Sequence, residues 1–330
     1  MGVRCKVFRF SWRFAVVWAV VSVFAGTTSA QEQSVILRPG IVVDVKNKLI
    51  YAMTPEGISA IDLTSGTSRW KTTAAAKPLA VTNDLLISQI EPKTRTNRLE
   101  LVTLDTKNSS VTMRSVAELP TSVKVGIGQT LDGKFDAEAQ MLADGPLVTW
   151  KFERRPLRGR LEESSAKAVV VPSPQIEASS LQAAAEGALR LNLTTGAVSN
   201  VDVSLLGSTF NREWTLNANE KVSGAPPTQY QSADKRHIMA SERIADEKTW
   251  AKYRWTIFDR ATNKRIGEFR THLAFAPFLI SDSTLIYETT PYINAGKQEP
   301  AKVRGVNLAT GQEIWNVEVR EVTFRGPFPP

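Results

Sequence analysis

Residues 60–70, AIDLTSGTSRW, and residues 305–315, GVNLATGQEIW, carry the same pattern near opposite ends of a 330-residue chain. In both, an Asp or Asn (Asx) is followed by Gly four residues later and by Trp eight residues later. An Asx side chain accepts a backbone N–H two residues on, and Gly readily adopts the left-handed conformation. The pattern therefore predicts a tight turn between two antiparallel strands. Its members are Asp62, Gly66 and Trp70 in the first copy and Asn307, Gly311 and Trp315 in the second.

Three weaker copies of the phrase lie between these two. They begin at Asp105, at Asn192 with Gly196, and at Asp259 with Asn263. Runs rich in β-branched and aromatic residues precede each copy, so we expect three strands before every turn and one after it. A four-stranded antiparallel unit that recurs along a chain predicts a β-propeller. The sequence thus predicts an all-β propeller with five recognisable blades, and up to seven if degenerate blades occupy the long intervals.

One long interval holds a segment of different composition. Residues 153–187 are rich in charged residues, Ser and Pro-flanked Val, which predicts an insertion rather than a blade. The best candidate for a helix in the chain, Leu181 to Glu186, falls within it.

The repeated phrase resembles the quinoprotein-like (PQQ-type) repeat, in which A-x-D-x-x-T-G ends one strand and Trp stands on the next. The resemblance implies that Trp70 and Trp315 pack between blades. It also implies that this packing weakens in the middle copies, which have other residues in place of Trp: Met113, Asn200 and Gly267.

Two kinds of protein carry this repeat, and the resemblance leaves both open. Some are enzymes that bind pyrroloquinoline quinone with calcium, and others are non-catalytic scaffolds of the bacterial envelope. Many of the enzymes are longer and carry adjacent cysteines facing the cofactor, whereas this chain has one cysteine, Cys5. We therefore expect a non-catalytic protein without a cofactor.

The first 30 residues have the order of a secretory signal peptide. Basic residues precede an apolar run from Phe14 to Ala25, and small residues lead to Ala30. We expect cleavage near Ala30, with residues 31–330 forming the propeller domain in the periplasm or outside the cell. The alternative is a retained anchor, although the apolar run is shorter than the ~20 residues that a membrane span needs.

Removal of this segment changes the charge and cysteine arguments. The whole chain has a net charge of +8, but four of its basic residues lie in the first 30. The remainder is only mildly basic, so we expect no nucleic-acid partner. Residues 31–330 contain no cysteine, so we expect no disulfide. They contain no apolar stretch long enough to span a membrane. We also expect the protein to be monomeric.

Two groups of residues suggest metal or catalytic chemistry only weakly. Asp132, Asp136 and Glu138 are close in sequence, but Lys134 interrupts them and EF-hand spacing is absent, so we expect a solvated turn and no metal. The two histidines, His237 and His272, have no partner at metal-ligand spacing. No catalytic residue is predicted.

The best candidate for a partner-binding patch is a basic run in the expected insertion. Its four arginines are either a solvated loop or an anion-binding surface for an acidic protein or an envelope polymer. They are Arg154, Arg155, Arg158 and Arg160. The ending, 324–330 (FRGPFPP), either packs on the domain or offers an extended motif to another protein.

Two functions remain after these exclusions. The first is an exported, non-catalytic propeller that binds a protein or polymer in the cell envelope. The second is a small-ligand binder or quinone-dependent enzyme with its site in the central channel. Polar and charged residues converging on that channel would distinguish the second from the first.

Overall fold

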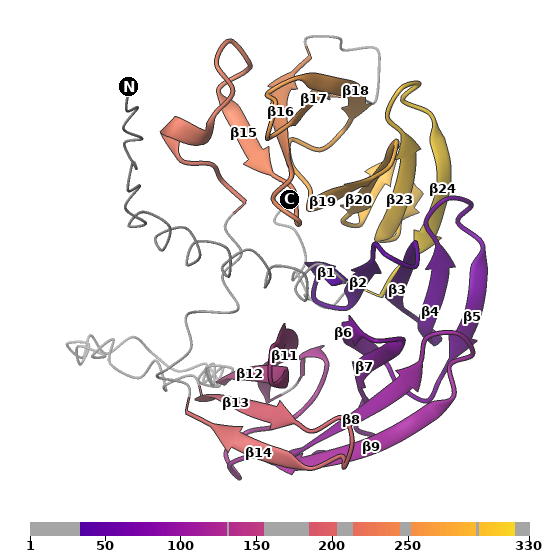
Figure 1. Cartoon of the computed structure of the whole chain (residues 1–330), viewed down its shortest axis with the longest axis vertical. Helices are drawn as coiled ribbons and strands as arrows, with labels where there is room; N and C mark the ends of the chain where they lie inside the picture. Colours follow the sequence, from indigo (N-terminus) through magenta and orange to yellow (C-terminus); the bar gives the residue numbers. More distant parts are fainter. Residues whose placement is uncertain are drawn as a thin grey trace, which may run out of the picture.

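The described residues of the computed structural model are 34–130, 132–154, 185–202, 214–244, 252–294 and 297–320. They form five antiparallel sheets in chain order, which we call blades 1 to 5, so the protein is a β-propeller with five blades in its described part (Figure 1). No helix among these residues is long and apolar enough to cross a membrane.

Blades 1 to 3 come from the first part of the chain. Blade 1 contains β1 (Ser34–Arg38), β2 (Ile41–Asp44), β3 (Leu49–Thr54), β4 (Gly57–Asp62) and β5 (Ser68–Thr72). Blade 2 contains β6 (Lys77–Thr82), β7 (Leu85–Gln89), β8 (Arg98–Asp105) and β9 (Val111–Glu118). Blade 3 contains β10 (Gly128–Gln129), β11 (Gly133–Leu142), β12 (Gly145–Arg154), β13 (Ala185–Leu191) and β14 (Val198–Val201).

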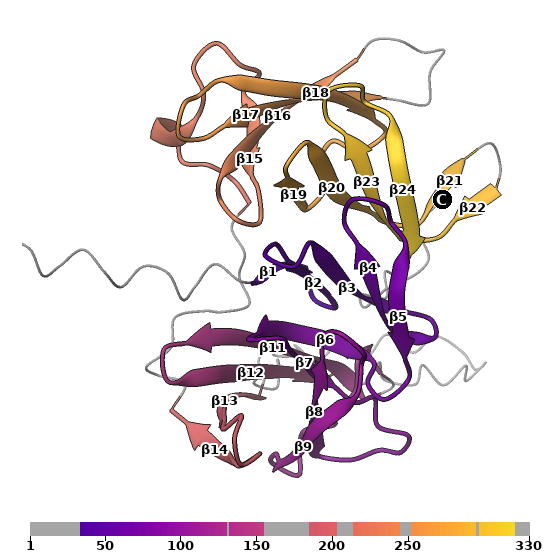
Figure 2. The same cartoon turned by 45° about the vertical axis from the view of Figure 1, so that its right-hand side comes forward.

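Blades 4 and 5 complete the set. Blade 4 contains β15 (Thr228–Gln231), β16 (His237–Arg243), β17 (Tyr253–Asp259) and β18 (Arg265–Thr271), and a short 3₁₀ helix, Ala218–Glu220, precedes it. Blade 5 contains β19 (Phe278–Ser281), β20 (Thr284–Thr289), β23 (Lys302–Asn307) and β24 (Glu313–Glu318). A separate hairpin, β21 (Tyr292–Asn294) and β22 (Lys297–Glu299), projects from blade 5 (Figure 2).

The blades are arranged in an arc with blades 3 and 4 at its two ends (Figure 1). Because every sheet is an antiparallel meander, successive connections alternate between the two faces of the propeller. One face, which we call the turn face, carries the five turns that begin at the Asx residues. The opposite face, which we call the connection face, carries the links between blades, the connection 90–97, and the strand ends that flank 155–184, 245–251 and the β21–β22 hairpin.

The boundaries of the expected insertion are corrected by strand pairing. Lys151 pairs with Glu186 and Phe152 with Ala185, so the segment that joins β12 to β13 is 155–184. The predicted helix over 181–186 is wrong at its end, because Ala185 and Glu186 belong to β13. Pairing of β13 with β12 overrides the local helix propensity of this segment. The pairing is close enough that Gly187 lies against the ring of Trp150.

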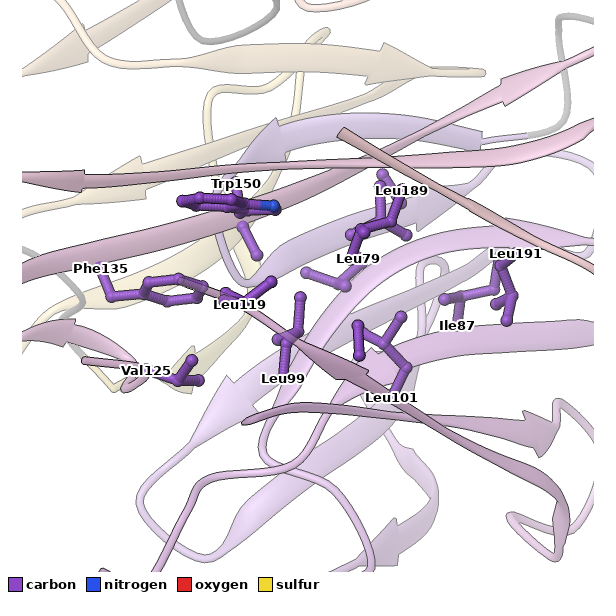
Figure 3. Packing of buried hydrophobic residues seen from close by; sticks show 14 of the residues in the cluster. Leu79, Ile87, Leu99, Leu101, Leu119, Val125, Phe135, Trp150, Leu189 and Leu191 are labelled. Carbon is purple, nitrogen blue, oxygen red and sulfur yellow. The ribbon is translucent and has the colours of Figure 1, made fainter. Parts of the chain in front are cut away.

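Hydrophobic side chains fill the spaces between neighbouring blades. Between blades 2 and 3, the stacked rings of Phe135 and Trp150 lie 6.5 Å apart beside leucines of both sheets (Figure 3). Comparable clusters join blades 1 and 2, blades 4 and 5, and blades 5 and 1. Within the described ranges, no such cluster contains residues of both blades 3 and 4.

Tryptophan docking reinforces two of these seams. Trp315 of blade 5 donates its indole N–H to the Leu63 carbonyl of blade 1 (2.8 Å), and its ring lies against Gly66. Trp70 of blade 1 likewise donates to the Thr106 carbonyl of blade 2 (2.7 Å). Each acceptor is the residue directly after an Asx. The tryptophans are therefore contacts between blades and not members of an open site.

Two other seams use substitutes at the same place. Met113 of blade 2 lies against Gly196 of blade 3, and Leu308 of blade 5 occupies the space beside Gly267 of blade 4.

Blade 3 departs from this arrangement by one residue. A bulge in the last hairpin of the other four blades brings the eighth residue after the Asx toward the next blade. The last hairpin of blade 3 has no bulge, so Ser199 pairs with Arg190, and Asn200 pairs with Leu189, which faces blade 2. The prediction that Asn200 stands at the tryptophan position is therefore wrong; Ser199 does.

Two glycines with the same backbone conformation should differ in their tolerance of a side chain. Gly66 (φ 69°) and Gly311 (φ 68°) are both left-handed. A Cβ at Gly66 would lie 2.2 Å from the Cβ of Trp315, whereas at Gly311 the nearest atom is 3.9 Å away. We expect Gly311→Val to cost about 1–2 kcal/mol from backbone strain. Gly66→Val should cost at least about 1 kcal/mol more, because it also displaces the tryptophan. Urea unfolding measures both, and equal losses would contradict the docking geometry.

Candidate functional site

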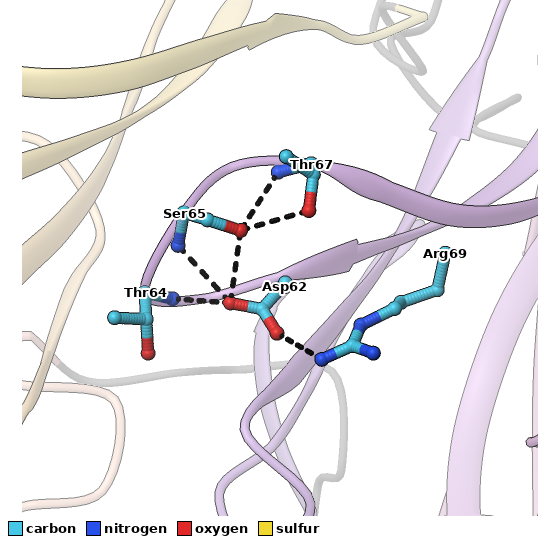
Figure 4. Close-up of polar contacts among 5 residues, drawn as sticks. All are labelled: Asp62, Thr64, Ser65, Thr67 and Arg69. Carbon is cyan, nitrogen blue, oxygen red and sulfur yellow. Dashed lines mark hydrogen bonds and ion pairs between the residues drawn. The ribbon is translucent and has the colours of Figure 1, made fainter.

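The five Asx residues occupy the same position in the five blades, at the end of the third of four consecutive strands. Their side-chain oxygens accept backbone N–H groups of the turn. Asp62 accepts from Thr64 and Ser65, both at 3.0 Å (Figure 4). The corresponding acceptors in the other blades are Asp105, Asn192, Asp259 and Asn307.

The fourth residue after each Asx is left-handed in every blade. Three are glycines, and the others are Ser109 (φ 61°) and Asn263 (φ 55°). In four blades the N–H of this residue donates to the Asx carbonyl at 2.8–2.9 Å. The Asx side chains of the repeat therefore hydrogen-bond within the turn.

Asp62 differs electrostatically from its counterparts. The guanidinium of Arg69 lies 2.7 Å from its second oxygen (Figure 4). This hydrogen bond, helped by the turn N–H groups and opposed by partial burial, lowers the pKa of Asp62 to about 2.

Paired charges, four of them largely buried, gather elsewhere, where the inner strands meet the connection face. We call this group the inner rim. It contains three cations and three carboxylates, which lie at or beside the ends of β1, β6, β7, β20 and β24 or within β11. Its members are Arg38, Lys77, Glu91, Asp136, Glu288 and Arg320.

Lys77 is the most deeply buried cation of the inner rim, with 1% of its side chain exposed. Its amino group contacts the carboxylate of Asp136 and donates to the Ala137 carbonyl at 2.8 Å. Beside it, buried Gln89 donates to the Gly126 carbonyl at 2.8 Å. These bonds join the inner strand of blade 2 to blade 3 and to the segment leading into it.

Two further ion pairs of the inner rim connect other blades. Arg38 of β1 pairs with Glu288 of β20 at 2.7 Å, which joins blades 1 and 5. Arg320 follows blade 5, and its guanidinium donates to both carboxylate oxygens of Glu91 at 2.6 Å. Its backbone N–H donates to the Met53 carbonyl at 2.8 Å. The hydrogen bonds to Arg320 lower the pKa of Glu91.

The inner rim can therefore hold blades together, but its charges are matched one to one. Strand β1 also lies on the inner edge of blade 1, toward the middle of the arc (Figure 1). Polar residues are thus grouped at the inner rim, as a channel site requires, but each of these charged groups is paired with another member of the rim.

The residues considered for metal or catalytic chemistry are dispersed. Asp136 and Glu138 lie on β11, so the solvated turn expected there is wrong: the alternation of buried apolar residues along 133–142 makes a strand. Asp132 pairs with Arg95 at 3.3 Å. In the described part of the chain, no three His, Cys, Asp or Glu side chains are grouped to hold a metal ion.

The two histidines lie on opposite faces of blade 4. His237 begins β16 on the turn face, where its backbone N–H donates to the Ser232 hydroxyl at 3.0 Å. His272 follows β18 on the connection face, and its ring stacks on that of Tyr292 at 4.1 Å. Burial and the Arg304 cation lower the pKa of His272. The structure does not bring the histidines together.

Part of the expected partner-binding patch is described. Arg154 is exposed at the end of β12, on the connection face. Arg155, Arg158 and Arg160, the signal segment 1–30 and the ending 324–330 lie outside the described residues.

The inner rim was missed by sequence reasoning. Its one visible signal is a charged residue inside an apolar run, such as Lys77 before PLAV or Glu288 within LIYET. Such a residue must find a partner when it is buried. The partner itself, 59 residues away for Lys77, cannot be read from local sequence.

Comparison with known proteins finds likeness among solved structures alone. No family model matches the chain, and no curated protein matches it. The Dos1 propeller is 11% identical over 83% of this chain and 56% of its own, with a TM-score of 0.26. A europium-containing methanol dehydrogenase is 10% identical over 83% and 67% of the two chains, with a TM-score of 0.24. A quinohemoprotein alcohol dehydrogenase from Comamonas testosteroni is 10% identical over 82% and 58%, with a TM-score of 0.23. The chain thus spans little more than half of two of these structures, and none transfers an activity to it.

The pair formed by Lys77 and Asp136 gives an asymmetric prediction. Asp136→Asn leaves a nearly fully buried ammonium without its carboxylate, so we expect a loss of about 3 kcal/mol. Lys77→Met should cost less, about 1–2 kcal/mol, because 17% of the Asp136 side chain reaches solvent. The double variant Lys77→Met/Asp136→Asn should lose clearly less than the sum of the two single losses, because neither charge is left buried without its partner. Urea unfolding of all four proteins forms a double-mutant cycle, and strictly additive losses would contradict direct pairing.

The turn at Asp62 gives a prediction about pH. Asp62→Asn keeps the oxygen that accepts the turn N–H groups, as Asn192 and Asn307 do, and loses only the attraction of Arg69. Because the folded-state pKa of Asp62 is lowered to about 2, its ionised form stabilises the fold above about pH 4. That advantage over Asn should fade as the pH falls from about 4 toward 2. Asp62→Ala should be about 1 kcal/mol less stable than Asp62→Asn at every pH, because it also loses the acceptor of the turn N–H groups. Urea midpoints across this pH range test both, and an Asp–Asn difference that grows on acidification would be inconsistent with the assignment.

Proposed function

We propose that this protein is an exported, non-catalytic propeller that binds an acidic protein or polymer of the cell envelope through its connection face. The observation that carries the proposal is the difference between the two faces. The turn face is built from five near-identical short turns, whereas the connection face carries long connections of differing length and composition. Binding residues are disproportionately found on such loops, held by a rigid scaffold.

The inner rim supports a binding module over an enzyme of the channel. Its three cations and three carboxylates are engaged in contacts between blades. In the two buried pairs, Lys77–Asp136 and Arg38–Glu288, it would be costly to redirect one member toward a ligand, because its partner would be left buried and unpaired. We therefore place the partner-binding residues on the loops.

The arginines at the exit of β12 are the proposed contact. Arg154 is exposed on the connection face, and three more arginines follow within six residues. Guanidinium groups present forked donors that match carboxylate, phosphate and sulfate oxygens. The basic start and apolar run of residues 1–30 support export to the compartment where envelope polyanions are found.

Replacing the four arginines tests the proposal. We expect Arg154, Arg155, Arg158 and Arg160→Ser to leave the melting temperature nearly unchanged. Retention on the envelope fraction of the native host should fall by about tenfold or more at low salt and lose its salt dependence. The matched control removes four exposed cations away from this connection: Lys46, Arg114, Lys264 and Arg270→Ser.

Two results would overturn the assignment. One is equal loss of retention in the control, which would show that net charge alone is responsible. The other is a raised melting temperature with pyrroloquinoline quinone and calcium, which would favour the small-ligand alternative.

A further inference from the structure

Among the seams formed by the described residues, only that between blades 2 and 3 is docked by methionine. Met113 stands eight residues after its Asx, at the position that Trp70 and Trp315 hold in their own blades. A Cβ at Gly196 of blade 3 would lie 3.2 Å from both the sulfur and the Cγ of Met113. The thioether therefore lies directly over the left-handed turn of blade 3. It has no N–H to donate, so this seam depends on apolar contact where the tryptophan seams add a hydrogen bond.

The four methionines of residues 31–330 differ in their exposure. Met53 and Met239 are buried, with 1% and 0% of their surface exposed. Met113 and Met141 are partly exposed, and both pack against the apolar cluster between blades 2 and 3. We expect a small oxidant in solvent to reach these two side chains first, and of the two only Met113 lies at the docking position.

Oxidation would change the chemistry of the docking group. When hydrogen peroxide oxidises a thioether, a sulfur lone pair takes one peroxide oxygen, the O–O bond breaks and the remainder leaves as water. Sulfur loses two electrons and the peroxide gains them. The product is a sulfoxide, which is polar and accepts hydrogen bonds but cannot donate one.

The turn beneath Met113 is poorly suited to a sulfoxide. The N–H of Gly196 already donates to the Asn192 carbonyl at 2.9 Å. The other polar atom close to this point is the carbonyl oxygen of Arg114, which is itself an acceptor. An acceptor that is buried without a donor destabilises the contact that buries it. A sulfoxide at Met113 should therefore weaken the seam.

Blade 3 has little else to hold it at the turn face. In the described part of the chain, no apolar cluster joins it to blade 4. The ion pair of Lys77 and Asp136 also joins it to blade 2, but this pair belongs to the inner rim at the opposite face. Weakening of the methionine seam should consequently loosen blade 3 as a unit and leave blades 4 and 5 unaffected.

We propose that Met113 is a site of reversible oxidation by peroxides, and that its sulfoxide loosens blade 3 from blade 2. Methionine sulfoxide reductases, which act on one epimer each, are the class of enzyme that would restore the thioether. This inference does not depend on the proposed function, and it stands even if the arginines of the connection face bind nothing.

The test exposes the folded full chain to hydrogen peroxide and follows each methionine by mass spectrometry of its peptide. We expect Met113 to be oxidised at least about tenfold faster than Met53 and Met239. The melting temperature should fall by about 2–5 °C. Amide hydrogen exchange in β12 and β13 should become about fivefold faster or more, with that in β17 and β23 unchanged. Treatment with both reductase types should reverse these changes.

Two variants separate the docking sulfur from oxidation in general. Met113→Leu keeps an apolar side chain of similar volume and removes the sulfur, so its melting temperature should no longer fall with peroxide. Met141→Leu, the matched control at the same seam, should keep the fall. If Met113→Leu does not fold, timed samples of the unaltered protein give the same distinction. In them, the destabilised fraction should follow the sulfoxide fraction of Met113 and not that of Met141.

Three results would overturn the proposal. The first is oxidation of Met113 no faster than that of Met239. The second is full oxidation of Met113 with the melting temperature and the exchange of blade 3 unchanged. The third is an undiminished fall in melting temperature in Met113→Leu, or a destabilised fraction that follows Met141.

Discussion

The contact between Trp315 and the first blade is the constraint on which the ring depends. One indole donates to the Leu63 carbonyl, lies over Gly66 and packs against Gly305 of its own sheet. At this seam the ring packs on two glycines and one left-handed turn, all supplied by the repeated phrase. The cluster beneath it joins blades 5 and 1, and Arg38 and Glu288 add an ion pair at the opposite face.

Most of the fold could be predicted from the sequence because its determinants are local. The turn chemistry of Asp62 and Gly66 acts within five residues, and alternating apolar runs identify the strands on either side. The five-bladed, all-β architecture was predicted on this basis and is confirmed. Trp70 and Trp315 were also assigned to contacts between blades, and the structure places them there.

What could not be predicted depends on pairing between distant segments. The inner rim is formed by residues such as Arg38 and Glu288, which only the packing of blade 5 against blade 1 brings together. The register of blade 3 turns on a single absent bulge, which moves the docking position from Asn200 to Ser199 without altering the local phrase. Asp136 and Glu138 resembled a solvated turn because their burial in β11 depends on the neighbouring strands. The loops of the connection face, where we propose that a partner binds, are likewise not specified by the repeat, since loops are free to vary on a fixed scaffold.

The Leu63 carbonyl and the Trp315 indole are separated by 252 residues, and this separation sets an order of events during biosynthesis. Blade 1 leaves the ribosome long before the blade that covers it exists. Its apolar surface around Ile50 and Ile61 stays unprotected until the last hairpin arrives, because the covering residues belong to blade 5. A chain with so non-local a closing contact forms its final structure slowly and late. In the export that we propose, that delay coincides with the period in which the polypeptide has to stay unfolded.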